Sequence, residues 1–157
     1  MAEISARLDH AGIAVADLGA SAAWFCDVFG LVPELTLTVD AIDLSIEMLI
    51  HPVLGYRLEL LHRPGTGAAG AGPDPGNGPG GKPANPAEAA LRAGYGHLAF
   101  DVTDLDGAWD RAVARGARPV MPPCPSPEPG VRMAFVADLE GNLIELLQRD
   151  QPAVTRE

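Results

Sequence analysis

Two histidines and two glutamates recur in matching contexts along the chain, and these are the side chains best suited to chemistry. The stretch HAGIAVADL begins at His10, and it aligns without a gap on HLAFDVTDL, which begins at His97, 87 residues later. The stretch LELLHR contains Glu59, and it aligns on IELLQR, which contains Glu145, 86 residues later. Two matches at almost one period indicate an internal duplication, so each His–Glu pair is expected to belong to one of two repeated modules.

The first module, about residues 7–62, carries the pattern of one strand, one helix and three strands. Residues 7–15 alternate in polarity, Asp17 can cap a helix start, and Gly30 can end the helix. We therefore predict a helix over about 19–29 and strands over about 7–15, 34–39, 43–51 and 56–62.

The second module, about residues 95–149, repeats this order. A predicted strand at about 95–102 is followed by a helix that begins after Asp104 and ends at Gly116, and by strands at about 117–121, 131–137 and 142–148. Residues 63–94 contain nine Gly and six Pro and are predicted to be a flexible connector or a lid over a site. The proline-rich stretch 121–130 is predicted to be a second loop, and 150–157 a C-terminal tail.

The two His–Glu pairs point to a metal site. Each His falls in the first predicted strand of its module and each Glu in the last, among apolar neighbours where an unpaired carboxylate is costly to desolvate. If the modules pack with pseudo-twofold symmetry, His10, Glu59, His97 and Glu145 converge on one divalent ion. Two imidazoles and two carboxylates suit Zn, Ni, Co, Mn or Fe, and the sequence does not choose among them. The alternative is that these residues are satisfied without a metal.

Composition excludes several other classes of function. A formal net charge of -10 disfavours nucleic acid and anionic lipid as partners. No apolar run is long enough to span a membrane, and the N-terminus lacks the pattern of a signal peptide, so a cytoplasmic location is expected. The two cysteines, Cys26 and Cys124, have no metal or redox spacing, and His51 and His62 have no counterpart in the repeat.

Three phrases carry a resemblance to a known family: LDHAGIAV from Leu8, GHLAFDV from Gly96, and DLEGNLIEL from Asp138. They resemble the vicinal oxygen chelate superfamily, which includes glyoxalase I, methylmalonyl-CoA epimerase, extradiol dioxygenases, and fosfomycin and bleomycin resistance proteins. The resemblance covers about residues 7–149 and implies a single α+β domain over 1–157. In such a domain, two βαβββ modules form a cupped, mostly antiparallel sheet around a metal cavity.

The resemblance also implies roles for individual residues. Ligands are expected at His10, Glu59, His97 and Glu145, and Glu145 is expected to leave the metal and act as a base. Glu47, on a neighbouring strand, is a possible second base. Within the superfamily the first module is most similar to methylmalonyl-CoA epimerases, although the turn from Asp138 to Asn142 is a generic superfamily turn.

Three functions follow as alternatives. The first is a metal-dependent isomerase or lyase that shifts a proton next to a carbonyl of a small molecule carrying a carbonyl or vicinal oxygens. The second is a non-haem Fe(II) dioxygenase that uses His10, His97 and Glu145 alone. The third is a metal-free binding protein that sequesters an antibiotic. In each case the partner is a small molecule, and a homodimer is expected by resemblance.

Overall fold

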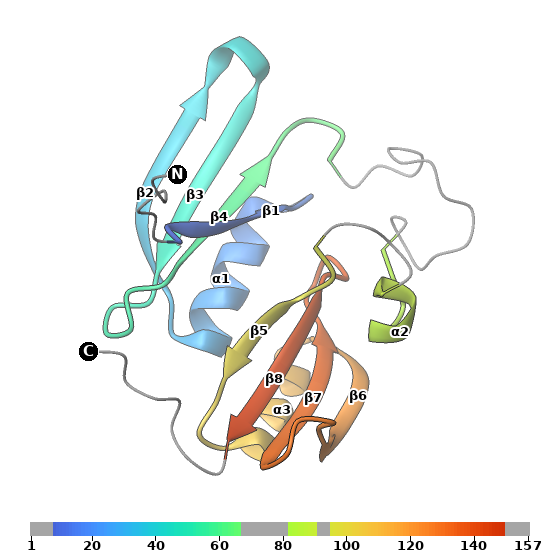
Figure 1. The fold of residues 1–157 in the computed structure, drawn as a ribbon. Helices are drawn as coiled ribbons and strands as arrows, with labels where there is room; N and C mark the ends of the chain where they lie inside the picture. Colours follow the sequence, from blue (N-terminus) through green and yellow to red (C-terminus); the bar gives the residue numbers. More distant parts are fainter. Residues whose placement is uncertain (1–7, 67–81, 91–94, 150–157) are drawn as a thin grey trace, which may run out of the picture. The chain divides into compact units, whose positions relative to one another are not determined.

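The computed structural model describes residues 8–66, 82–90 and 95–149. The chain divides into two compact units, Met1–Ala68 and Ala69–Glu157, and each is described by itself (Figure 1). The first unit contains the first predicted module and the second contains the other. That both belong to one domain stays a prediction.

The first unit is a four-stranded sheet with one helix. Its elements follow the order β1 (His10–Ala14), α1 (Leu18–Phe29), β2 (Val32–Val39), a short 3₁₀ turn (Asp40–Ile42), β3 (Leu44–Ile50) and β4 (Arg57–His62). The sheet order is β1-β4-β3-β2. β1 runs parallel to β4, while β3 is antiparallel to both β4 and β2, so this sheet is mostly antiparallel.

Local signals fix the ends of α1, and packing holds it on the sheet. The Asp17 side chain accepts a hydrogen bond from the Ala20 N–H at 2.9 Å, and Gly30 ends the helix in the left-handed region at φ 69°. Phe25 of α1 is fully buried, as are Leu49 of β3 and Leu60 of β4. These side chains form the core between helix and sheet, and they fix which face of β4 is left for other contacts.

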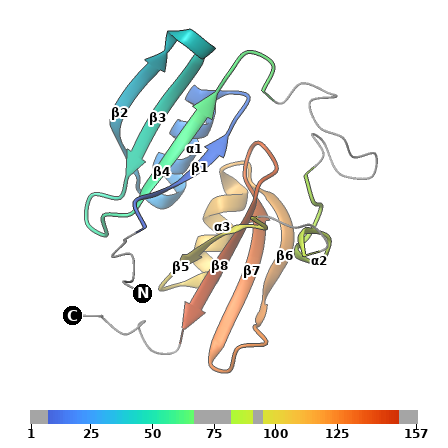
Figure 2. The ribbon, with the colours of Figure 1, turned by 45° about the horizontal axis from the view of Figure 1, so that its top comes forward.

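The second unit repeats this arrangement (Figure 2). Its elements are α2 (Pro86–Ala89), β5 (Leu98–Asp101), α3 (Leu105–Ala114), β6 (Arg118–Pro125), β7 (Val131–Ala137) and β8 (Leu143–Arg149). The sheet order β5-β8-β7-β6 matches that of the first unit, with β5 parallel to β8 and the other pairs antiparallel. The predicted α+β fold of two βαβββ modules is thus confirmed.

Three local predictions need correction. The proline-rich stretch after Met121 is not a loop throughout, because β6 continues to Pro125. It can do so because β6 is an edge strand with register shifts at 119/121 and 121/124, where missing N–H donors are tolerated. Within the predicted connector, Asn85 caps the single-turn helix α2; residues 67–81 and 91–94 lie outside the described part. His97 lies one residue before β5 rather than inside the strand.

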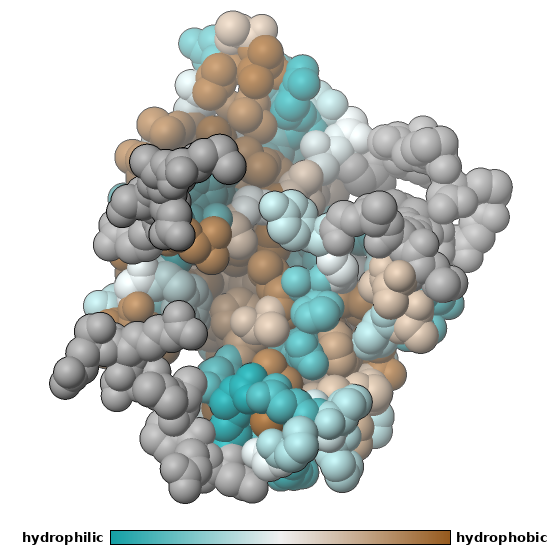
Figure 3. Space-filling view, in the orientation of Figure 1, coloured by the Kyte–Doolittle hydropathy of each residue, from teal (hydrophilic) through white to brown (hydrophobic). Residues whose placement is uncertain are grey.

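Hydrophobic side chains are exposed along one strand of the first unit. Val32, Leu35, Leu37 and Val39 of β2 are 39–46% exposed, and β2 is an edge strand. In Figure 3, hydrophobic residues gather over the part of the first unit where Figure 1 shows β2 and β3. Among the described residues, no helix is long and apolar enough to cross a membrane.

Candidate metal-binding site

The two faces of each sheet have different neighbours, and contacts with the helix tell them apart. In the second unit, Arg132 of β7 forms an ion pair with Asp106 of α3 at 2.8 Å. The Gln148 side chain of β8 accepts a hydrogen bond from the Leu105 N–H at 2.9 Å. Since side chains alternate along a strand, Glu145 lies on the opposite side of β8, which we call the helix-free face.

His97 and Glu145 meet on the helix-free face of the second unit. Ala99 is the register partner of Glu145 on β5, and His97, two residues earlier, shares the face of Ala99. The His97 Nε2 lies 3.1 Å from the Glu145 Oε2. Phe135, the partner of Glu145 on β7, packs edge-on against the His97 ring at a centroid distance of 5.4 Å. An aromatic wall therefore lies beside the pair.

His10 and Glu59 form the equivalent pair in the first unit. Gly12 of β1 is the register partner of Glu59 on β4, and His10 lies two residues before Gly12 on the same face. The His10 Nε2 is 3.5 Å from the Glu59 Oε2. Met48 takes the place that Phe135 has in the second unit, as the partner of Glu59 on β3. The duplication in sequence is thus also a duplication in geometry.

The spacing within each pair suits two ligands of one metal ion. Donor atoms about 2.1 Å from a metal, at ligand angles of about 90–110°, lie about 3.0–3.4 Å apart. The measured separations of 3.1 and 3.5 Å are close to this range. The Glu59 and Glu145 side chains are only 20% and 15% exposed, whereas both imidazoles are more than a third exposed. Within each unit, the imidazole nitrogen and the carboxylate oxygen of the pair therefore have a spacing and a chemistry that fit two ligands of a divalent ion.

One module alone does not supply the four predicted ligands. Across the ranges 8–66, 82–90 and 95–149, no group of three or more His, Cys, Asp or Glu side chains is placed to hold a metal ion. Each unit contains one His–Glu pair, which supplies two potential ligands.

Glu47, the predicted second base, is not brought to the His10–Glu59 pair. Its register partner is Leu60, whose side chain lies in the core against α1, whereas Glu59 lies on the other face of β4. The Glu47 carboxylate instead lies near Cys26 of α1. Burial raises the pKa of the Cys26 thiol, and the negative charge of Glu47 raises it further. This placement gives no support to a role for Glu47 as a base.

A charged network around His10 was missed by sequence reasoning. The His10 Nδ1 lies 2.7 Å from the Asp9 Oδ1, and the Arg57 Nη1 donates to the same oxygen at 2.9 Å. Arg57 also donates to the Glu34 Oε2 through Nε at 2.7 Å. The hydrogen bond with His10, followed by the Arg57 charge, lowers the pKa of the Asp9 carboxyl; the Glu34 carboxylate raises the pKa of Arg57.

The sequence indicates only part of this network. Asp9 adjoins His10, and Arg57 shares a strand face with Glu59 by simple alternation. Glu34 reaches Arg57 from the β2 bulge between Pro33 and Leu35, which no local pattern reveals.

The two remaining histidines, His51 and His62, contact backbone groups. The His51 Nδ1 accepts hydrogen bonds from the Val53 and Leu54 N–H groups in the turn between β3 and β4. The His62 Nδ1 is 3.1 Å from the Val15 carbonyl oxygen at the end of β1. The first contact stabilises a turn and the second joins the ends of the paired strands β1 and β4, so neither histidine belongs to the His–Glu pairs.

Comparison with known proteins identifies the family. A model of the Glyoxalase/Bleomycin resistance protein/Dioxygenase superfamily matches residues 7–146. The chain belongs to this superfamily. The resemblance seen in the sequence is therefore confirmed, and members of the superfamily commonly use a divalent metal, bind small molecules and often form dimers.

Solved structures of the glyoxalase superfamily share the fold. A glyoxalase family protein from Bacillus cereus is 23% identical with a TM-score of 0.69, over 95% of this chain and 98% of that one. Glyoxalase I from Zea mays is 20% identical with a TM-score of 0.67, over 92% of this chain. The match spans only 45% of the length of the maize protein. Trypanothione-dependent glyoxalase I from Leishmania major is 23% identical with a TM-score of 0.60, over 92% of this chain and 87% of that one. No curated protein sequence gives a match.

Proposed function

We propose that this glyoxalase-superfamily protein is a divalent-metal-dependent enzyme that shifts a proton next to a carbonyl of a small molecule. The observation that carries the proposal is the duplicated His–Glu pair, with nitrogen–oxygen separations of 3.5 and 3.1 Å on the helix-free face of each sheet. A single such pair is easily explained as a polar contact. Two pairs at equivalent register positions in a duplicated fold are better explained by a shared ligand.

The proposed roles follow from donor type and surroundings. His10, His97, Glu59 and Glu145 would hold the ion, which would supply a Lewis acid that polarises a carbonyl oxygen. Glu145 would accept the carbon-bound proton at its carboxylate and return it to the neighbouring atom. Its register partner Phe135 is 4% exposed, so this carboxylate lies beside an apolar wall that limits competition from water.

The placement of Glu47 bears on the type of reaction. A second base on the far side of the substrate would suit epimerisation, but Glu47 lies on the α1 face of its sheet. One base is enough for an isomerisation that moves a proton between adjacent atoms. We therefore favour an isomerase or lyase of the glyoxalase type over an epimerase.

Metal analysis tests the proposal directly. The full chain, purified without chelator, is expected to contain about one divalent ion per four-ligand set, and Glu59→Ala is expected to lose most of it. Added α-hydroxycarbonyl probes are then expected to take up solvent deuterium next to the carbonyl only with metal-loaded wild type. Bound iron that survives Glu59→Ala would favour a dioxygenase instead. If the protein binds no metal and catalyses no deuterium uptake by the probes, the result would contradict the proposal and favour a metal-free binding protein.

The proposed physiological partner, apart from substrate, is a second copy of the chain. The exposed apolar residues of the edge strand β2, Val32, Leu35, Leu37 and Val39, support this assembly, because such an edge is prone to pairing. In the dimer, the four ligands could come from one chain or from two.

A further inference from the structure

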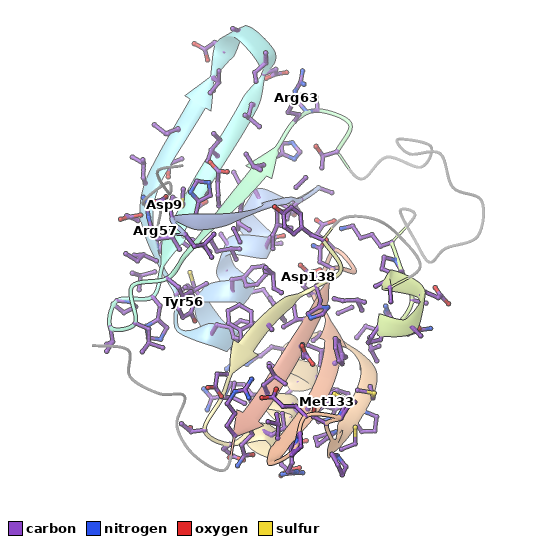
Figure 4. All side chains as sticks on the ribbon, viewed as in Figure 1. Asp9, Tyr56, Arg57, Arg63, Met133 and Asp138 are labelled. Carbon is purple, nitrogen blue, oxygen red and sulfur yellow. The ribbon has the colours of Figure 1, made fainter. Side chains whose placement is uncertain are left out.

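On its Nδ1 side, the His10 ring contacts a series of charged side chains. In Figure 4, Asp9 and Arg57 are labelled side by side where β1 and β4 begin. Asp9 contacts His10 at 2.7 Å, Arg57 contacts Asp9 at 2.9 Å, and Glu34 contacts the Arg57 Nη2 at 2.6 Å. Three strands, β1, β4 and β2, or their flanking residues, thus contribute to the orientation of one imidazole.

We propose that Asp9 is a positioning residue that fixes the tautomer and rotation of His10, with Arg57 and Glu34 holding Asp9 in place. The Asp9 carboxylate can only accept, so the His10 Nδ1 must carry the proton in this contact. The Nε2 then bears the lone pair, and it is this atom that lies 3.5 Å from Glu59. The expected effect on metal affinity rests on the proposed function, whereas the contact between Asp9 and His10 does not.

The second module holds its histidine differently. The residue before His97 is Gly96, which has no side chain to accept from the ring, and His97 instead packs edge-on against Phe135. Charge therefore orients His10, whereas an aromatic contact orients His97. Removal of Asp9 is expected to release one imidazole and leave the other in place.

Within this network, the Asp9 side chain is too exposed to contribute much to folding stability. The Asp9 side chain is 59% exposed, and ion pairs in such positions contribute little to stability. A carboxylate behind a ligating histidine, by contrast, typically affects metal affinity by about 10–100-fold. The two roles can therefore be separated by measuring affinity and stability on the same variants.

The test compares Asp9→Ala and Asp9→Asn with a matched control, Asp106→Ala. Asp106 is also exposed and also pairs with an arginine, Arg132 at 2.8 Å, but it lies on the helix side of its sheet, opposite to the face of His97 and Glu145. Long-range ¹H–¹⁵N spectra of the metal-free full chain, above the titration range of imidazole, report the ring tautomer, with His10 assigned by its loss in His10→Asn. Affinity for Zn²⁺ or Co²⁺ is measured by competition with a chromophoric chelator.

In wild type and Asp106→Ala, His10 is expected to be protonated at Nδ1 and metal affinity to be equal. In Asp9→Ala the Nε2-protonated form is expected to appear, and affinity to fall by about 10–100-fold with little change in thermal stability. Asp9→Asn, which can still accept from Nδ1, is expected to lie between. An unchanged tautomer in Asp9→Ala, or a changed tautomer with unchanged affinity, would overturn the inference. A wild type that binds no metal would refute the proposed function, and the tautomer alone would then decide the role of Asp9.

Discussion

The same substitution on opposite faces of one sheet gives a sharp test of the site. Glu59→Gln removes a carboxylate from the helix-free face, and Glu47→Gln removes one from the α1 face of the neighbouring strand. Both variants change one oxygen to nitrogen and lose one charge. Only the first is expected to weaken metal binding.

The magnitude follows from the charges. A dication and a carboxylate about 2.1 Å apart attract one another by about 4 kcal/mol even at the dielectric constant of water. An amide oxygen keeps part of this interaction, so we expect Glu59→Gln to lose about 2.7 kcal/mol, or about 100-fold in affinity. With free metal at about 100 times its dissociation constant, wild type is stabilised by about 2.7 kcal/mol and Glu59→Gln by only about 0.4 kcal/mol.

Thermal melts with and without metal measure this difference. For a chain of 157 residues, wild type and Glu47→Gln are expected to gain about 5–10 °C on metal addition, and Glu59→Gln about 1–2 °C. Melts in excess chelator provide the baseline for each variant. A full metal-dependent gain in Glu59→Gln would refute Glu59 as a ligand, and an equal loss in Glu47→Gln would refute the assignment of the two faces.

Three further predictions concern Gly12 beside Glu59, the exposed edge of β2, and the buried carboxyl group of Asp138. A Cβ at Gly12 would lie 3.3 Å from the Glu59 Oε2, so in Gly12→Ala the Glu59 carboxylate must move by a few tenths of an ångström. Since a displacement of about 1 Å costs about 100-fold, this smaller shift is expected to weaken metal binding by about fourfold. Ala99→Gly, the counterpart in the second unit, is the control in the same competition assay. Leu37→Glu places a charge on the exposed apolar edge and is expected to convert a dimer to a monomer in sedimentation; an unchanged mass would exclude β2 from the interface. Burial raises the pKa of Asp138 above 3.8, so its contribution to stability is greatest below that value and is lost as pH rises through the folded-state pKa. The unfolding free energy of Asp138→Asn, from urea titrations, is therefore expected to rise relative to wild type as the pH increases above about 4, and an opposite trend would contradict the effect of burial.

The sequence determined the fold and the identity of the paired residues. Duplicated motifs, capping residues such as Asp17 and Asp104, and alternating strands are local signals, and the structure follows them closely. The same alternation places Glu59 on the face of β4 opposite to Leu60, and Glu145 on the face of β8 opposite to Gln148. Such features depend only on residues near one another in the chain or on an exact repeat.

Tertiary structure decided how each side chain is used. Register between strands, set by packing against α1, puts Glu47 beside Leu60 and away from Glu59, which no pattern within its own strand could reveal. The β2 bulge brings Glu34 to Arg57 and completes the support of His10. Edge position allows β6 to continue through prolines that predict a loop in the sequence. In each case the deciding contact joins residues from different strands, and contacts of that kind are fixed by long-range packing rather than by local sequence.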